Sequence, residues 1–271
     1  MKRIIALGIL LTTLGCTSQH KEKDMNDHTH HHEHDQGNHD QHHSSEAGAE
    51  LIVATDPAES VAGRPVTLKL MIHAADGTMV KDFEIVHDEK VHLVIVRDGL
   101  DHFAHIHPAA DAKGNLTVRH TFPVGGKYRL IADYSSSGGG HATATGSVFI
   151  GGESPAAPPL VADAPGEIAA DSVRATITVA PLKVDEPARV AFVVRNDEGP
   201  AKLEPYMGAL GHLMFVSAAG NYVHVHPVPG DAEEGTAEFE AHFPEPGLYK
   251  GWGQFKTRGQ VRVIPFALKV E

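Results

Sequence analysis

The strongest constraint on the fold is that residues 49–271 contain two copies of one sequence pattern. FAHIHP at 103–108 matches YVHVHP at 222–227, and FPVGGKYRLIADY at 122–134 matches FPEPGLYKGWGQF at 243–255. The matching segments start about 120 residues apart, so each copy is long enough to be a domain rather than one unit of a solenoid.

Each copy has the pattern of a β-sandwich. Short segments rich in Val, Ile, Leu and Thr are separated by Gly, Pro and Asp, which favours strands over helices. In the first copy we expect strands near 51–55, 65–73, 91–96, 103–108, 115–122, 127–134 and 142–150. Such a series is typical of an immunoglobulin-like sandwich, and a cupredoxin-like sandwich fits equally. We predict an all-β chain with sandwiches at 49–150 and 161–271, joined by a Gly/Pro/Ala-rich linker at 151–160.

The N-terminal segment has the form of an export signal. A basic start precedes an apolar run between residues 4 and 14, which is too short to span a bilayer. Residues 1–15 are therefore predicted to be a signal peptide. Cys16 follows Gly15 as in a bacterial lipobox and is predicted to be lipidated; the alternative is an ordinary secretory signal with a stray cysteine. We expect a lipid-anchored protein outside the cytoplasm, on the periplasmic face of the outer membrane or on the cell surface.

Residues 16–48 hold nine of the 21 histidines of the chain and almost no apolar side chains. A segment of this composition cannot bury a core, so we predict a disordered tether between the anchor and the sandwiches. It can collect divalent metal such as Zn, Cu or Ni, or serve as a solvated spacer, and both roles can hold together.

Composition narrows the classes of function. The chain has 35 acidic residues against 23 Lys and Arg, a formal charge of −12, which argues against a nucleic-acid partner. Its single cysteine excludes an intramolecular disulfide and a thiolate metal cluster. Neutral imidazole is the commonest metal ligand and titrates near neutral pH, so the histidine excess indicates metal binding or pH sensing.

Three histidines recur at matching positions of the two copies. They are His92, His105 and His107 in the first copy and His212, His224 and His226 in the second. Residues two apart on a strand point to the same face, so the two histidines of each His-x-His motif share a face. A one-residue slip of the neighbouring strand would remove the first histidine of each set from that face.

The third histidine of each set follows from hairpin geometry. If strands 91–96 and 103–108 pair with Val96 opposite Phe103, then His92 lies opposite His107. The second copy has a shorter loop, yet pairing Val216 with Tyr222 sets its first and last histidines opposite each other in the same way. Each hairpin is therefore predicted to gather three imidazoles at one end.

Three imidazoles can bind Zn(II), Cu(II) or Ni(II), with a fourth position for water or another side chain. We expect Cu(II) or Zn(II). Candidates for the fourth ligand in the first copy are His87, His102, His120 and His141. His120 is expected to be half-buried beside the core. The second copy has no histidine at the places that match His120 and His141, so its site is expected to be the poorer one. The alternative is that these histidines are polar rim residues or structural groups bonded to carbonyls.

The two copies resemble bacterial extracytoplasmic heavy-metal-binding proteins and, more loosely, YtkA-like immunoglobulin-fold domains. The resemblance is carried by a His-Leu strand start, Phe/Tyr-x-His-x-His-Pro and Phe-Pro-x-x-Gly-x-Tyr, over residues 60–150 and 185–271. It implies metal binding by the six recurring histidines, beside a metal-efflux or copper-handling membrane complex. A blue-copper site is excluded because it needs a cysteine ligand.

We therefore predict a non-enzymatic, membrane-anchored protein that binds a divalent transition metal for buffering, delivery or efflux and resistance. One alternative is a tandem sandwich with a structural or interaction role, in which only the tether binds metal incidentally. Another is a three-histidine metal hydrolase, for which no residue is placed as a general base. A pH sensor is a variant of the structural alternative.

Overall fold

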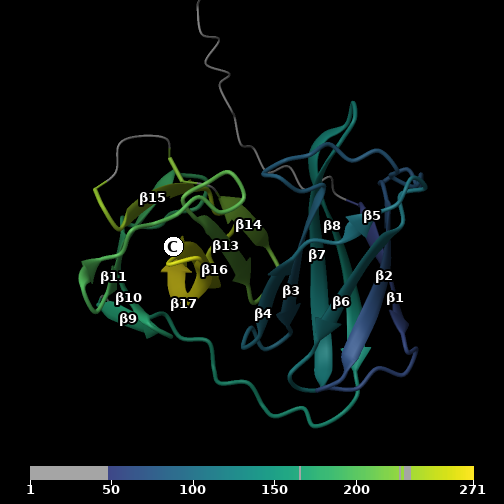
Figure 1. The fold of residues 1–271 in the computed structure, drawn as a ribbon, viewed down its shortest axis with the longest axis horizontal. Coiled ribbons are helices and arrows are strands. Elements are labelled where there is room, and N and C mark those ends of the chain that lie inside the picture. The colour runs from purple at the N-terminus through teal and green to yellow at the C-terminus, as the bar shows by residue number, and fades with distance from the viewer. Residues whose placement is uncertain (1–47, 165, 226, 229–232) are drawn as a thin grey trace, which may run out of the picture. The chain divides into compact units, whose positions relative to one another are not determined.

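The computed structural model describes residues 48–164, 166–225, 227–228 and 233–271. Every regular element within these ranges is a β-strand (Figure 1). In this part of the chain no helix is long and apolar enough to cross a membrane. The predicted signal peptide, Cys16, His226 and the predicted tether up to residue 47 lie outside the described residues.

The first sandwich contains eight strands. They are β1 (Glu50–Asp56), β2 (Pro65–His73), β3 (Val91–Arg97), β4 (Phe103–Ile106), β5 (Ala109–Ala110), β6 (Leu116–Thr121), β7 (Gly126–Ser136) and β8 (Gly140–Ile150). Their hydrogen-bonded order is β4-β3-β7-β8-β1-β2-β6-β5, in which β8 and β1 meet through one parallel pair and the other neighbours are antiparallel. All seven strands expected from the sequence are present, and the one expected at 103–108 ends at Ile106.

The second sandwich has a similar series of strands, which form two separate sheets. Its strands are β9 (Glu167–Ala170), β10 (Val173–Val179), β11 (Ala188–Asn196), β12 (Gly199–Pro200), β13 (His212–Ser217), β14 (Tyr222–Val225), β15 (Thr236–Ala241), β16 (Gly247–Thr257) and β17 (Gln260–Val270). One sheet has the order β12-β11-β10-β9, with β15 also paired to β11, and the other has the order β14-β13-β16-β17. The predicted all-β chain of two tandem sandwiches is confirmed.

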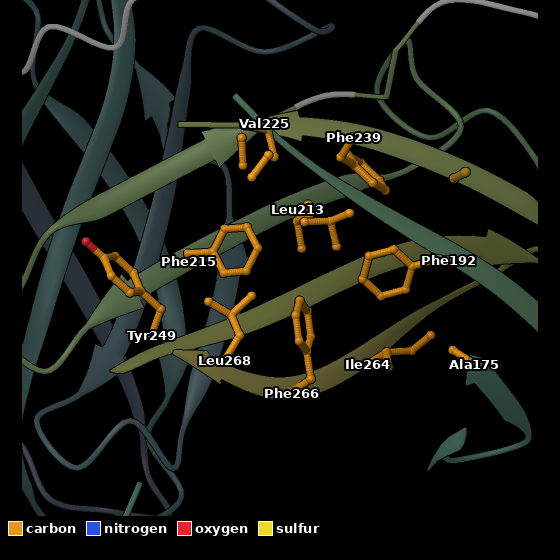
Figure 2. Packing of buried hydrophobic residues seen from close by; sticks show 14 of the residues in the cluster. Ala175, Phe192, Leu213, Phe215, Val225, Phe239, Tyr249, Ile264, Phe266 and Leu268 are labelled. Carbon is orange, nitrogen blue, oxygen red and sulfur yellow. The ribbon is translucent and has the colours of Figure 1, made fainter. Parts of the chain in front are cut away.

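Aromatic rings fill the core of the second sandwich (Figure 2). The Phe192, Phe215 and Phe266 side chains are almost fully buried there. Gly251 on β16 leaves room for Phe215 and Phe266, because a Cβ atom at this position would lie 2.6 Å from Cζ of Phe266. The core of the first sandwich is instead mainly aliphatic, with Leu68 among its fully buried side chains.

A third apolar cluster joins the two sandwiches. All seven residues of β3 are buried, because one face of the strand packs into its own core and the other is covered by the second sandwich. Val94 and Val96 on that outer face pack in one cluster with Met214 and Trp252. The Phe103 and Trp252 rings stack with centroids 4.7 Å apart and an interplanar angle of 13°. Strands β3 and β4 therefore have a buried outer face on which polar side chains can be enclosed.

The register of both hairpins agrees with the sequence-based expectation. In the pairing of β3 with β4, Val96 lies opposite Phe103 at one end and Leu93 lies opposite Ile106 at the other. Strand β13 pairs with β14 in the corresponding way, starting from Val216 and Tyr222. The recurring histidines of the first copy, and His212 and His224 of the second, therefore lie toward the end of each hairpin that is remote from its loop.

Candidate metal centre

His92, His105 and His107 come together at the end of the β3–β4 hairpin. Each offers one ring nitrogen, and these three atoms all lie within 4.8 Å of one another. The ring centroids are 4.9 to 5.3 Å apart. The hairpin register causes this convergence, because it sets His92 opposite His107 on the face that His105 shares.

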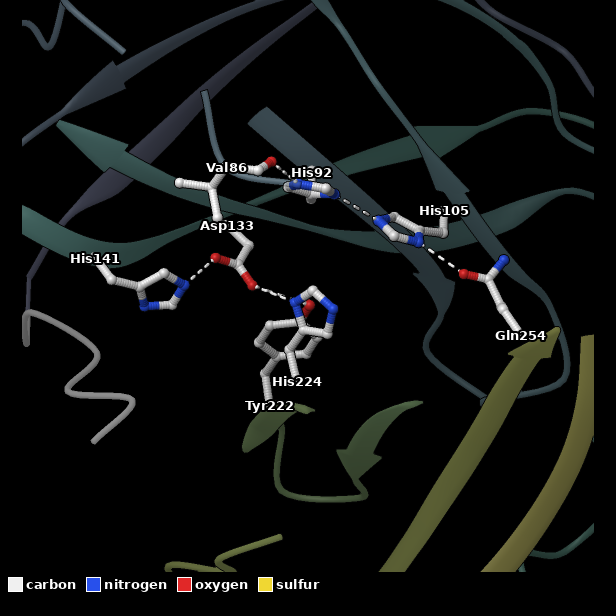
Figure 3. Close-up of polar contacts among 8 residues, drawn as sticks. All are labelled: Val86, His92, His105, Asp133, His141, Tyr222, His224 and Gln254. Carbon is white, nitrogen blue, oxygen red and sulfur yellow. Dashed lines mark hydrogen bonds and ion pairs between the residues drawn. The ribbon is translucent and has the colours of Figure 1, made fainter. Parts of the chain in front are cut away.

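Two of the three rings are held by hydrogen bonds through the nitrogen that points away from the triad (Figure 3). The Nε2–H group of His92 donates to the carbonyl oxygen of Val86 at 3.0 Å. The Nδ1–H group of His105 donates to Oε1 of Gln254 in the second sandwich at 2.7 Å. The remaining nitrogens, Nδ1 of His92 and Nε2 of His105, face each other at 3.2 Å.

Burial keeps all three rings neutral at physiological pH. It lowers the pKa of His92, lowers that of His105 well below its usual range and lowers that of His107 to about 4. Nε2 of His107 is buried and has no hydrogen-bond partner among the described residues. Its Nδ1 lies 4.0 Å from Oε1 of Glu89. A neutral imidazole carries one lone pair on a ring nitrogen, which is the form that binds metal.

His212 and His224, the described recurring histidines of the second copy, are held in the same manner. The Nε2–H group of His212, at the start of β13, donates to the carbonyl oxygen of Tyr206 at 2.9 Å. The Nδ1–H group of His224, on β14, donates to Oδ2 of Asp133 in the first sandwich at 2.7 Å (Figure 3). The ring centroids of His212 and His224 are 5.9 Å apart.

The two sets of histidines do not form two remote sites. The His105 ring centroid lies 6.2 Å from that of His212 and 6.0 Å from that of His224. His87 adds a further ring, 6.4 Å from His92 and 6.0 Å from His212. We call this group the histidine cluster, and its members are His87, His92, His105, His107, His212 and His224.

The histidine cluster has approximate two-fold symmetry. Asp133 and Gln254 occupy the same position in the matching segments FPVGGKYRLIADY and FPEPGLYKGWGQF. Each accepts a hydrogen bond from the middle histidine of the opposite sandwich, His224 and His105 respectively. Each sandwich thus supplies the group that orients a histidine of the other.

Asp133 is the buried anion of the site. Burial by itself would raise its pKa, but hydrogen bonds from His141 and His224 outweigh that effect and hold the pKa well below its usual range. The same contact with Asp133 raises the pKa of His141, although burial opposes it. The hydroxyl of Tyr222 lies 3.5 Å from Oδ2 of Asp133. His141 therefore reaches the cluster through this carboxylate.

Two of the four candidates for a fourth ligand lie elsewhere. His102 lies five residues before His107, about 16 Å away along an extended strand, at the loop end of the hairpin. Its ring centroid lies 5.7 Å from that of His120, and Tyr128 packs beside it. His120 is half-buried next to Phe122, as expected. The structure therefore does not bring His102 or His120 to the triad: His102 lies at the other end of the hairpin, and His120 lies on β6 beside it.

Asp133 and Gln254 are parts of the site that the motifs alone did not reveal. A signal for them was present in the repeat. Asp133 lies two residues after Ile131, and Gln254 lies two residues after Trp252. Both apolar side chains face outward, so Asp133 and Gln254 lie on the outer face of their strands. An apolar side chain on the outer face of a sandwich strand indicates that the face is covered.

This arrangement has the composition of a transition-metal site. Neutral imidazoles are ligands for Zn(II), Cu(II) and Ni(II), and three of them leave a fourth position open. Ligating histidines usually donate their other N–H group to a carbonyl or carboxylate, as His92 does here. The donor set of the triad therefore fits such an ion.

Comparisons with known proteins identify the repeat. The model of a domain of unknown function, DUF8832, matches residues 44–148 and again residues 168–271, which confirms two copies of one domain. No curated protein matches the chain significantly. The resemblance to heavy-metal-binding and YtkA-like proteins stays a prediction.

Several solved β-structures are similar to the chain at low sequence identity. The Escherichia coli adhesin FdeC is 14% identical over 84% of this chain and 65% of its own, with a TM-score of 0.28. Domains 4 and 5 of the S-layer protein SbsC are 12% identical over 83% of this chain and 99% of their own, with a TM-score of 0.24. Fibronectin(III)-like modules of Clostridium thermocellum CbhA are 12% identical over 81% of this chain and 93% of their own, with a TM-score of 0.21.

Proposed function

We propose that this chain, which belongs to the DUF8832 family through both of its halves, binds a divalent transition metal at His92, His105 and His107. The observation that carries the proposal is the pair of imidazole nitrogens, Nδ1 of His92 and Nε2 of His105, that face each other at 3.2 Å. Each ring donates its other nitrogen's hydrogen to an oxygen acceptor.

The positions of the protons on the two rings make this contact informative. A carbonyl oxygen only accepts hydrogen bonds, so the Val86 carbonyl places the proton of His92 on Nε2. Oε1 of Gln254 likewise places the proton of His105 on Nδ1. The two facing nitrogens of the neutral rings then both carry lone pairs, which repel each other unless a cation lies between them. Two nitrogen ligands at 2.0–2.1 Å from a tetrahedral ion are about 3.3 Å apart.

His107 supplies the third nitrogen. Its Nε2 atom is buried without a hydrogen-bond partner among the described residues, an arrangement that costs about 1–3 kcal/mol unless a ligand satisfies it. An all-imidazole donor set suits Zn(II) and Cu(II), and we propose one of these as the ion. The fourth position is left to water or to His87.

We propose that the protein stores or delivers metal and catalyses no reaction. His92 is 4% and His105 8% exposed, so a substrate would have little access to an ion held by them. The predicted signal and lipidated Cys16 would place the protein outside the cytoplasm, attached to a membrane by lipid alone. Buffering of metal, or its transfer to an efflux or copper-handling membrane complex, fits that location.

Metal titration of the full-length chain tests the proposal. The background is a full-length variant whose nine histidines between residues 17 and 48 are changed to glutamine, so that only the sandwiches contribute. We expect calorimetry and elemental analysis to show loss of one equivalent of Zn(II) or Cu(II) in the double variant His105→Ala, His107→Ala. The control is His242→Ala, whose side chain is 52% exposed. Circular dichroism establishes that each variant is folded, and an unchanged stoichiometry in the folded double variant would falsify the assignment.

A structural or interaction role is the second candidate. It is favoured by the hydrogen bonds that His105 and His224 make between the sandwiches, because these bonds need no metal. In that case the histidines hold the tandem sandwiches together, and the chain presents a surface to a partner. The same titration distinguishes the two functions, since the structural role predicts that the glutamine background binds no metal.

A further inference from the structure

We infer that the histidine cluster holds a second divalent metal ion, bound by His212 and His224, with Asp133 of the first sandwich as the residue that orients His224. The inference rests on the proposed function of the first triad and extends it to a centre with two ions. The DUF8832 match covers both halves of the chain but assigns no ligand to either.

His212 is prepared for metal in the same way as His92. Its Nε2–H group donates to the Tyr206 carbonyl oxygen, so in the neutral ring Nδ1 is the nitrogen without a proton. Tyr206 precedes His212 by six residues, as Val86 precedes His92, and a tight turn follows each of these carbonyl residues. Burial lowers the pKa of His212 to about 3, so the ring is neutral at physiological pH.

His224 has the stronger orienting partner. Its Nδ1–H group donates to the Asp133 carboxylate at 2.7 Å, which directs Nε2 toward the cluster. A carboxylate that accepts the distal N–H group of a ligating histidine fixes the orientation of the ring. Gln254, at the equivalent place for His105, performs the same orientation without a charge. The ionised Asp133 also offsets part of the charge of a buried dication.

The spacing of the second pair resembles that of the first. The His212 and His224 ring centroids are 5.9 Å apart with an interplanar angle of 39°, compared with 5.3 Å and 37° for His92 and His105. His87, whose ring centroid lies 6.0 Å from that of His212, serves the second ion as a third imidazole, and the fourth position of the first ion is then left to water. A donor set of imidazoles selects the same class of ion as the first triad, Zn(II) or Cu(II).

The experiment is a Zn(II) titration of the full-length glutamine background by calorimetry and elemental analysis. We expect two equivalents per chain, and one equivalent in the double variant His212→Ala, His224→Ala. Asp133→Asn keeps the size of the side chain but removes its charge, and we expect it to weaken one of the two equivalents 10- to 100-fold. His242→Ala is the exposed control. With Cu(II) in place of Zn(II), dipolar broadening of the electron paramagnetic resonance spectrum reports two neighbouring ions.

The outcomes separate this inference from the proposed function. One equivalent that is lost in His105→Ala, His107→Ala but kept in folded His212→Ala, His224→Ala overturns the second ion and leaves the first. No bound metal in the background overturns both. If the alanine variants do not fold, the single variants His224→Gln and Asp133→Asn test the second site instead. Full binding of two ions by both of them would contradict it.

Discussion

His105 and Gln254 are joined by a 2.7 Å hydrogen bond that links the two sandwiches, and its counterpart in the repeat joins His224 to Asp133 at the same distance. The middle histidine of each hairpin is thus fixed by a side chain that belongs to the other half of the chain. The geometry of the candidate centre depends on this exchange of orienting groups.

Gln254→Ala is expected to weaken metal binding at the first triad 10- to 100-fold, because His105 loses the acceptor that fixes its proton on Nδ1. Gln254→Glu keeps an acceptor and is expected to bind at least as tightly as the original chain. Competition with a chromophoric chelator measures both affinities in the glutamine background. Gln260→Ala, at an exposed site on β17, is the control. Equal affinities in all three variants would mean that Gln254 does not orient the ligand.

Asp133→Ala is expected to lower the free energy of unfolding by about 3–5 kcal/mol, since it leaves the buried groups that pair with this carboxylate without their anion. Asp133 is 2% exposed and bonds to both His141 and His224. Urea unfolding in the presence of a chelator measures this loss without a contribution from metal. A matched change at an exposed acid, Asp197→Ala, is expected to stay within 0.5 kcal/mol. Similar losses for the two variants would contradict the role given to Asp133.

Phe103→Ala is expected to destabilise the contact between the sandwiches by about 1–3 kcal/mol, because the half-buried ring stacks on Trp252. Trp252 is the single tryptophan of the chain, so the tryptophan fluorescence comes entirely from this contact region. We expect a red-shifted emission maximum in the variant, since water gains access to the indole ring. Phe149→Ala removes a side chain that is 73% exposed and should leave the emission unchanged. An unshifted maximum in Phe103→Ala would show that Trp252 is shielded by other residues.

The stability of the fold is expected to fall in mild acid, in part because of His102. Burial, and then the neighbouring His120, lower the pKa of His102 from 6.5 to about 4. Between these values the unfolded chain takes up a proton at this side chain and the folded chain does not. Stability therefore decreases as the pH drops from 6.5 to about 4, by at most about 1.4 kcal/mol per pH unit for this group.

The variant that tests this pH dependence is His102→Gln. Urea unfolding between pH 4.5 and 7, with a chelator present, should show a shallower decline than the original chain. His242→Gln, at an exposed histidine, should keep the original slope. Parallel pH profiles for His102→Gln and the original chain would rule out a contribution from His102.

The local geometry of the first triad was accessible from the sequence. Strand periodicity and a short loop determine the register of a hairpin, so the opposition of His92 and His107 followed from the pairing of Val96 with Phe103. The half-buried place of His120 followed from its alternation with Phe122. These features depend on residues that are close together along the chain.

The meeting of the two sets of histidines was not accessible in this way. It depends on the outer faces of β3 and β13 packing against each other, and hairpin register gives no information about such a contact between domains. The His105–Gln254 contact joins residues 149 positions apart. Apolar residues on both faces of β3 indicate a covered strand, but they do not identify the surface that covers it.

The exchange of orienting groups described above is the contact pattern of an isologous dimer, in which residue i of one copy meets residue j of the other and the reverse also holds. Here both copies lie in one polypeptide, so their docking is independent of protein concentration. Since the copies are separate stretches of sequence, each can also change alone. Asp133 and Gln254 occupy equivalent places but differ in charge, which a pair of identical subunits could not achieve. A symmetric scaffold thereby acquires two unequal halves.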